Sequence, residues 1–261
     1  MVSLFIGVGI NMIRGHIADA LMVMAIKLHE EHISWPELLL STLHQFSTND
    51  HPAVRAVVLR RLPFLQSILP EVGWGVFELI MRKGSEGLWD MAECCLYYTY
   101  NHGFDRVSPW LNKIVSEDIK DGLQAWGRIS ALAVLSGKIE NCDFIKQLKE
   151  LSDSDAWEGA IDVWTHHENF QRHQDLCLAG LSAALSDDNQ YSSALIASMG
   201  SLFWRERAGY YFTRTSVRAL FFISIYEFRS IEDWFIRFWR MVKYCFMHRT
   251  IVCIEGYGDL S

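Results

Sequence analysis

The sequence predicts an all-α protein, and more narrowly a HEAT/armadillo-like helical-repeat solenoid built from antiparallel helix pairs. Three observations lead there. Apolar residues recur at spacings of three and four along most of the 261-residue chain, which is the period of an amphipathic helix. Helix-breaking residues fall every ten to twenty positions. A short motif recurs at an interval near forty residues, the range of HEAT and armadillo repeats.

Apolar stripes and turn residues place the helices in order. One stripe is Ile13, Ile17, Ala20, Leu21, Met24 and Leu28, and another is Val54, Val58, Leu62 and Leu65. Proline, glycine and small polar residues separate the stripes, first at 34–36, 49–52, 69–70 and 83–85, and then at 101–103, 136–138, 152–154 and 186–188, because these residue types end helices. The predicted helices are 10–32, 36–46, 52–68, 71–83, 86–101, 106–115, 119–135, 141–150, 154–167, 171–185, 190–205, 214–227 and 231–248.

The repeat motif is an acidic or polar residue followed by a branched apolar residue and an arginine. It is clearest at 50–58 (DHPAVRAVV), with echoes at 11–18 (NMIRGHIA) and 215–220 (TSVRAL) and weaker ones beginning at Asp118 and Asp153. We interpret these as structural repeat positions, where each arginine bonds an acidic cap of a neighbouring repeat: Arg14, Asp50, Arg55, Asp118, Asp153 and Arg218. The prediction is one repeat domain, 1–261, with an atypical C-terminal cap at about 229–261.

Charge and cysteine usage restrict the partners and the compartment. A net charge of −7 argues against binding to nucleic acid or anionic lipid. The six cysteines include no CxxC pair, which favours reduced thiols in the cytosol. The apolar N-terminus lacks a basic region and a cleavage motif, and no stretch of eighteen uncharged apolar residues occurs. We expect a soluble, cytoplasmic protein that does not bind a membrane.

Catalytic motifs are scarce. No phosphate-binding loop is present, and His29-Glu30-Glu31-His32 spaces its histidines three apart, whereas a zinc-protease helix needs four. A second cluster, His166, His167, Glu168 and His173, leaves open a metal-dependent α-helical enzyme. A solvated, charged helix end is the favoured interpretation of the first cluster and a polar turn between helices that of the second, so we predict no catalytic residue, no metal and no cofactor.

The C-terminal quarter interleaves arginine with aromatic residues. This pattern is typical of protein-recognition hot spots and of single-stranded nucleic-acid grooves. It is also compatible with a final packed helix whose arginines cover its outer face. The residues predicted to bind a partner are Trp204, Arg207, Tyr210, Tyr211, Arg214, Trp234, Arg237, Trp239 and Arg240.

Five segments together resemble a known family: INMIRGHIADAL (10–21), DHPAVRAVVLRRL (50–62), FDRVSPWLNKIVSED (104–118), SDAWEGAIDVWTHH (154–167) and HQDLCLAGLSAALSDD (173–188). They resemble the C-terminal HEAT-like α-solenoid of bacterial antiviral STAND ATPases, over residues 8 to 225. In that family the solenoid is the sensor that engages a viral protein, whereas effector and ATPase domains precede it. The ATPase motifs have no counterpart in this chain, so no catalytic residue can be transferred.

The function expected from the sequence is therefore non-catalytic. The chain would be a recognition or scaffold module that binds a protein, and the resemblance implies the target-sensing part of a bacterial anti-phage defence system. Its partner would be a viral protein or an ATPase or effector subunit. Two alternatives stay open, a metal-dependent α-helical enzyme and a nucleic-acid-binding HEAT-like protein, and the sequence leaves the oligomeric state undefined.

Overall fold

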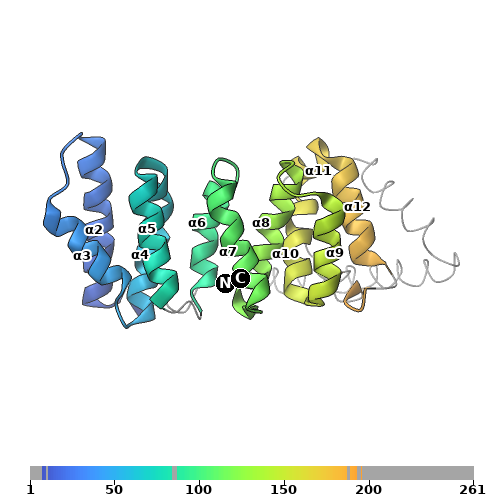
Figure 1. Ribbon diagram of the computed structural model, residues 1–261, viewed down its shortest axis with the longest axis horizontal. Coiled ribbons are helices and arrows are strands. Elements are labelled where there is room, and N and C mark those ends of the chain that lie inside the picture. The colour runs from blue at the N-terminus through green and yellow to red at the C-terminus, as the bar shows by residue number, and fades with distance from the viewer. Residues whose placement is uncertain (1–7, 10, 84–86, 187–188, 193–194, 196–261) are drawn as a thin grey trace, which may run out of the picture. The chain divides into compact units, whose positions relative to one another are not determined.

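A computed structural model describes residues 8–9, 11–83, 87–186, 189–192 and 195. These residues form eleven α-helices and one 3-10 helix and include no strand, so the all-α prediction is confirmed for this part of the chain (Figure 1). The helices are α2 (Ile13–Glu30), α3 (Glu37–Ser47), α4 (Pro52–Ile68), α5 (Pro70–Lys83), α6 (Trp89–Thr99), α7 (Phe104–Ser116), η1 (Lys120–Gly122), α8 (Leu123–Leu135), α9 (Asn141–Leu151), α10 (Ser154–Trp164), α11 (His167–Arg172) and α12 (Gln174–Leu185). The predicted helices 190–205, 214–227 and 231–248 lie almost wholly outside the described residues.

Ten predicted helices overlap observed ones, but the prediction near residue 170 was wrong. It placed one helix over 154–167 and the next over 171–185, whereas α10 ends at Trp164 and a separate short helix, α11, precedes α12. The side chain of Asn169 closes the break, because its Nδ2 donates to the carbonyl of Val163 (3.0 Å), which also accepts from the amide of His166 (3.3 Å) at the end of α10.

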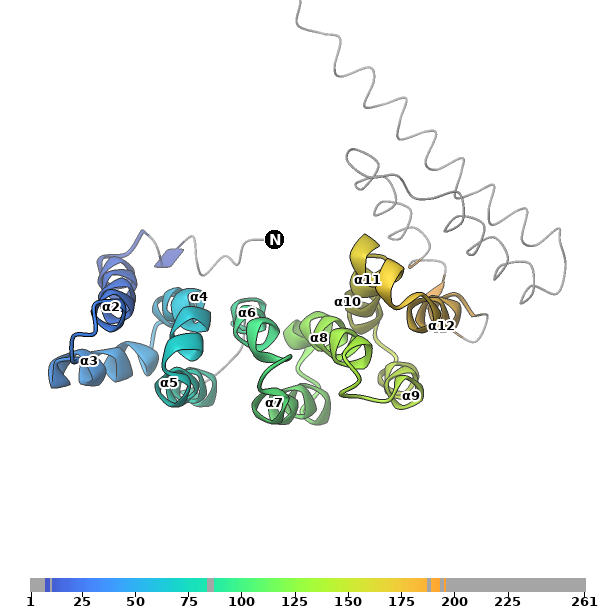
Figure 2. The ribbon, with the colours of Figure 1, turned by 90° about the horizontal axis from the view of Figure 1, so that it is seen from above.

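The chain divides into two compact units, Met1–Ile129 and Ser130–Ser261, and the division falls within α8. In the first unit α2, α4 and α6 lie side by side in one layer, and α3, α5 and α7 form the other (Figure 2). We call these the α4 layer and the α5 layer. Helix α4 contacts α2 and α6 in its own layer and α3 and α5 in the other.

The core of the first unit is centred on α4. Every position from Ala53 to Leu59 is buried, and Leu62, Leu65 and Gln66 are buried as well. Small and branched side chains let neighbouring helices approach α4 from several directions. Gly73 of α5 shows how close this packing is, because a Cβ added there would lie 2.6 Å from the Cα of Gln66.

The second unit has its own aromatic core. Trp157 and Trp164 of α10 are buried, and the ring of Phe144 from α9 meets Trp164 edge to face, with 6.0 Å between the ring centroids. Gly180 of α12 lies so close to the indole of Trp164 that an added Cβ would be 2.3 Å from it. Ser152 ends α9 in the left-handed region (φ 50°) and accepts a hydrogen bond at its hydroxyl from Gln190 Nε2 (2.6 Å).

No helix of the described residues is both long enough and apolar enough to cross a membrane.

Candidate functional site

Polar contacts fix how helices of one layer align in the first unit. In three cases an acid on one helix pairs with an arginine two helices later: Asp19 with Arg61, Glu93 with Arg128, and Glu71 with Arg106. The paired residues are 42, 35 and 35 positions apart in the chain. The first pair is bidentate, since Arg61 Nε and Nη2 donate to the two carboxylate oxygens of Asp19 at 2.9 and 3.3 Å. This hydrogen bonding holds the pKa of Asp19 below its ordinary value.

The exposed side of the α4 layer carries three large aromatic side chains. Phe64 of α4 is 61% exposed, and Tyr98 and Tyr97 of α6 are 67% and 43% exposed. The rings of Tyr97 and Tyr98 meet edge to face with 5.4 Å between their centroids. We call Phe64, Tyr97 and Tyr98 the α4–α6 patch.

The register of α4 and α6 sets the level of the patch residues along the two neighbouring helices. Cys95 Sγ donates to the carbonyl of Leu59 (3.6 Å), which sets these two residues at one level. The two helices run in the same direction (Figure 1), so Phe64, five residues beyond Leu59, lies one to two turns along, near the level of Tyr98. Tyr98 is three residues after Cys95 and therefore leans toward α4.

The patch has the chemistry of a protein-binding surface. Tyrosine offers a large apolar ring with a hydroxyl for hydrogen bonding and loses little side-chain entropy on binding. Arg60, one turn before Phe64, is exposed and adds a cation beside the rings. Aromatic residues next to arginine are enriched where partner proteins bind most tightly.

A second surface feature lies in the α5 layer. An open hollow of about 670 Å³ separates α5 from α7, and its apolar lining includes Trp74, Met81 and Trp110. The ring of Phe77 meets Trp110 edge to face at 5.0 Å and joins the two helices beneath it. The acids and bases around the hollow balance, and they are Glu71, Glu78, Asp105, Arg82, Arg106 and Lys113. With no excess of either charge around it, the hollow does not indicate a particular ligand.

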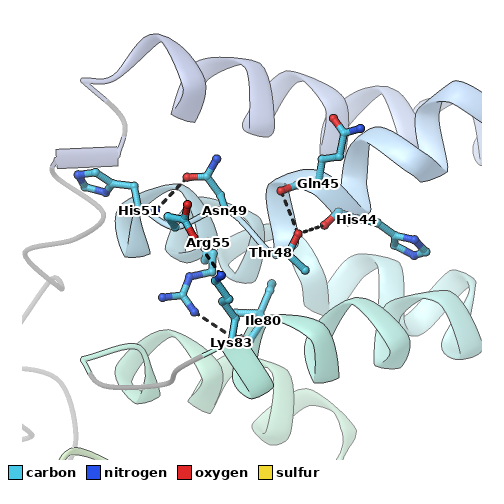
Figure 3. A network of polar contacts seen from close by, with 9 residues as sticks. His44, Gln45, Thr48, Asn49, His51, Arg55, Ile80 and Lys83 are labelled. Atoms are coloured by element: carbon cyan, nitrogen blue, oxygen red, sulfur yellow. Dashed lines mark hydrogen bonds and ion pairs between the residues drawn. The ribbon is translucent and has the colours of Figure 1, made fainter.

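The predicted repeat residues Asp50 and Arg55 interact electrostatically, and each also contacts α5. Arg55 is buried, and its Nη1 donates to the carbonyl of Ile80 in α5 (3.2 Å; Figure 3). Asp50 pairs with Lys83 at the end of α5 (2.9 Å). His51 caps α4, because its Nδ1 accepts from the amide of Ala53 (3.2 Å). The arginine thus joins α4 to a backbone carbonyl of α5, and it also interacts electrostatically with the carboxylate of Asp50.

The other predicted repeat residues differ from one another in their exposure and contacts. Arg14 is exposed and forms no ion pair with a described residue. Asp118 has a positive φ (50°) and pairs with Lys120 (2.7 Å). Asp153 is a helix cap, since its carboxylate accepts from the amide of Asp155 (2.9 Å). Arg218 lies outside the described residues.

All nine residues predicted to bind a partner lie outside the described residues, so their prediction stays a prediction. They are Trp204, Arg207, Tyr210, Tyr211, Arg214, Trp234, Arg237, Trp239 and Arg240.

The histidine clusters lie at helix ends. His32 follows α2 and has a positive φ (56°). His166 and His173 flank α11, whereas His167 is its first residue. Within the described part of the chain, no three His, Cys, Asp or Glu side chains gather closely enough to hold a metal ion.

The four described cysteines are free thiols, Cys94 and Cys142 exposed and Cys95 and Cys177 buried. Burial raises the pKa of Cys95 well above its ordinary value and that of Cys177 to about 12. A raised pKa keeps both buried thiols protonated and unreactive at neutral pH.

Sequence reasoning did not identify the α4–α6 patch. A signal was present, because Phe64 and the Tyr97-Tyr98 pair interrupt otherwise regular apolar stripes. That they lie on neighbouring helices depends on the contact between α4 and α6, which no spacing within one helix reveals.

No protein-family model, curated protein or solved structure matches this chain.

Proposed function

We propose that the chain is a HEAT/armadillo-like helical-repeat solenoid that recognises a protein partner through the α4–α6 patch and has no catalytic role of its own. The observation that carries the proposal is the patch itself. Three aromatic side chains between 43% and 67% exposed lie on two adjacent helices, where water contact is unfavourable unless another surface covers them.

The spacing of contacts supports the repeat part of this proposal. In the first unit, contacts between successive helices of a layer join residues 35 to 42 positions apart. In the second unit, Gln190 and Tyr191 contact Ser152 across 38 and 39 positions. A repeat of about forty residues, each unit covering the apolar face of the next, gives this spacing.

The resemblance to antiviral STAND ATPases suggests what the partner is. As part of the same proposal, the chain senses a viral protein in a bacterial anti-phage defence system, or joins an ATPase or effector subunit of it. The resemblance is one of sequence pattern. A crosslinking experiment with and without phage infection distinguishes a viral partner from a host subunit.

Photo-crosslinking from the patch tests the function. A benzoylphenylalanine placed at Tyr98 should link to a partner of defined mass in cells of the source organism, with and without phage infection. The matched control places the same group at Leu38, which is 76% exposed on α3 in the other layer. A product that appears only after infection indicates a viral partner, and one present throughout indicates a host subunit. Equal labelling from Tyr98 and Leu38 would contradict the proposal.

Affinity measurements with the purified partner then test the individual residues of the α4–α6 patch. Phe64→Ala and Tyr98→Ala should each weaken affinity by about thirtyfold, the effect typical of a hot-spot residue. Leu38→Ala should leave the affinity unchanged. Retained affinity in the Phe64→Ala/Tyr98→Ala double variant would remove the patch from the interface.

A further inference from the structure

Arg60 of α4 differs from most cations of the first unit in having no acidic partner bonded to it. Arg55 is buried and donates to the carbonyl of Ile80. Among the lysines and arginines that the structure describes in this unit, Arg14 and Arg60 are the two without a hydrogen bond or an ion pair. The others form ion pairs with acids of the same unit, and they are Lys27, Arg61, Arg82, Lys83, Arg106, Lys113, Lys120 and Arg128.

The carboxylate of Asp19 interacts electrostatically with Arg60 but is hydrogen-bonded to Arg61. Its two oxygens accept from Nε and Nη2 of Arg61 at 2.9 and 3.3 Å. The side chain of Arg60 is exposed, so its N–H donors are available to a group from another molecule. A guanidinium is weakly hydrated and pairs with a carboxylate through two parallel hydrogen bonds, which makes arginine well suited to an ion pair at an interface.

Arg60 shares a helix face with Phe64 of the α4–α6 patch. The two residues are four positions apart, which places their Cβ atoms about 5–6 Å from each other on one side of α4. Phe64 is 61% exposed. An exposed ring with an unpaired cation one turn away complements a segment that carries an apolar residue and a carboxylate at a similar separation. Two residues of an extended segment span about 6–7 Å, and three or four residues of a helix place side chains about 5–6 Å apart.

The charges around the patch favour a carboxylate over a nucleic-acid backbone. A strand of phosphates is bound by several lysines and arginines at once, and the net charge of the chain is −7. Arg61 of α4 and Arg128, which contacts α6, are already neutralised by Asp19 and Glu93. Arg60 alone is sufficient for one carboxylate.

We infer that the α4–α6 patch binds an acidic-apolar segment of its protein partner, with a carboxylate paired to Arg60 and an apolar side chain against Phe64. The inference rests on the proposed function, because it names the chemistry of the partner at the same patch. Arg60 selects the partner by charge, whereas the aromatic rings supply most of the affinity.

A yeast-displayed library of short random peptides, sorted against the full chain, tests this chemistry. Peptides that bind the wild-type chain but not Phe64→Ala depend on the patch. They should be enriched in Asp or Glu within about four residues of an apolar residue. Arg60→Glu should reverse the preference and select Lys or Arg there. The matched control is Arg14→Glu, because Arg14 is also exposed and has no ion pair with a described residue; it should select the same acidic peptides as the wild-type chain.

Affinities for a synthetic copy of the most enriched peptide test the ion pair directly. Arg60→Met retains an apolar stem but removes the charge, and it should weaken binding by about tenfold. Replacing the acidic residue of the peptide with its amide should cost the wild-type chain the same factor. The same replacement should cost Arg60→Met nothing further, as a double-mutant cycle requires of a direct pair. Added salt should weaken the wild-type complex more than the Arg60→Met complex.

Two results would overturn the inference and leave the proposed function standing. One is a set of patch-dependent peptides without a preference for acids, and the other is an Arg60→Glu chain that selects the same peptides as the wild-type chain. Displacement of the peptide by oligodeoxythymidine would also overturn it, in favour of a nucleic-acid partner. If no selected peptide depended on Phe64, the inference and the proposed function would both be wrong. Circular dichroism should show that every variant keeps the helical content of the wild-type chain.

Discussion

Helices α4 and α7 of the first unit differ in how many of their residues are buried and in how the buried residues are arranged. Ten of the seventeen residues of α4 are buried, and they point in every direction around the helix. Only Val107, Leu111 and Ile114 are buried in the thirteen residues of α7, and they form one stripe. The difference follows from position, since α4 contacts helices in both layers and α7 packs mainly on α6. An amphipathic pattern therefore describes the outer helix well and the central helix poorly.

The largest predicted effect comes from inserting a charged residue into α4 and, for comparison, into α7. Ala56→Glu places a carboxylate at a fully buried position of α4, and an unpaired buried charge costs several kcal/mol. We expect the first unit to lose its cooperative unfolding transition at neutral pH. Asn112→Glu on the exposed side of α7 should change the unfolding free energy by less than about 0.5 kcal/mol. Urea unfolding followed by circular dichroism measures both, and a stable Ala56→Glu protein would refute the assignment of α4 as a central helix.

Two glycines of α5 lie on different sides of the helix. Gly73 faces α4, and Gly75 is exposed. A Cβ at Gly73 would lie 2.6–2.7 Å from the Gln66 backbone, whereas nothing lies within 4 Å of one at Gly75. Gly73→Ala should lower the unfolding free energy by about 3 kcal/mol through overpacking. Gly75→Ala should raise it by about 0.5–1 kcal/mol, because alanine has the higher helix propensity. Thermal unfolding of the two variants side by side checks the opposite signs.

Arg14 and Arg55 occupy equivalent positions of the sequence motif, but replacing them with alanine should lower the unfolding free energy by different amounts. Arg55→Ala removes a buried side chain and leaves the Ile80 carbonyl without its donor, at a cost of about 1–2 kcal/mol. Arg14→Ala removes an exposed side chain and should change stability by less than about 0.5 kcal/mol. Equal losses in chemical denaturation would show that both arginines have one structural role.

The smallest effect concerns the Asp19–Arg61 pair that joins α2 to α4. Arg61 lowers the folded-state pKa of Asp19 below its ordinary value of 3.8. The pair therefore stabilises the fold above that pH, and its contribution is lost as pH falls through the folded pKa. Both side chains are about one third exposed, so solvent screening limits the contribution to about 1 kcal/mol or less.

Asp19→Asn should therefore be less stable than the wild-type chain at neutral pH, and the difference should vanish in acid. Urea unfolding as a function of pH measures it, with Lys113→Gln as the control for a more exposed pair, Lys113–Glu117. A difference that is constant with pH would mean that Asp19 acts through packing and not through charge.

The sequence predicted the helices well where a turn residue marks each end. Pro36, Pro52 and Gly137 stand at or beside observed helix boundaries. It failed between Trp164 and Gln174, because the break there depends on a hydrogen bond from Asn169 to a carbonyl six residues earlier. Such a bond gives no periodic signal.

The stripe Ile13, Ile17, Ala20 and Met24 shows the main limit of pattern reasoning. Its spacing is that of a core face, and the second stripe, Val54, Val58, Leu62 and Leu65, is indeed buried. The first is exposed, because α2 has Gly15, Ala18, Met22 and Ala25 on its other side and these pack against α4. Periodicity identifies an apolar face but not which of two apolar faces has a neighbour.

The sequence by itself determined that the described chain is helical and where most of its helices begin and end, because these depend on residues within one or two turns. The tertiary structure decided which arginine is buried, which stripe of α2 is covered, and which aromatic side chains of α4 and α6 stay exposed. Those outcomes depend on contacts between residues far apart in the chain, such as Arg55 with Ile80 (25 positions) and Asp19 with Arg61 (42 positions). Local propensity does not encode such contacts, since they arise only when one helix packs against another.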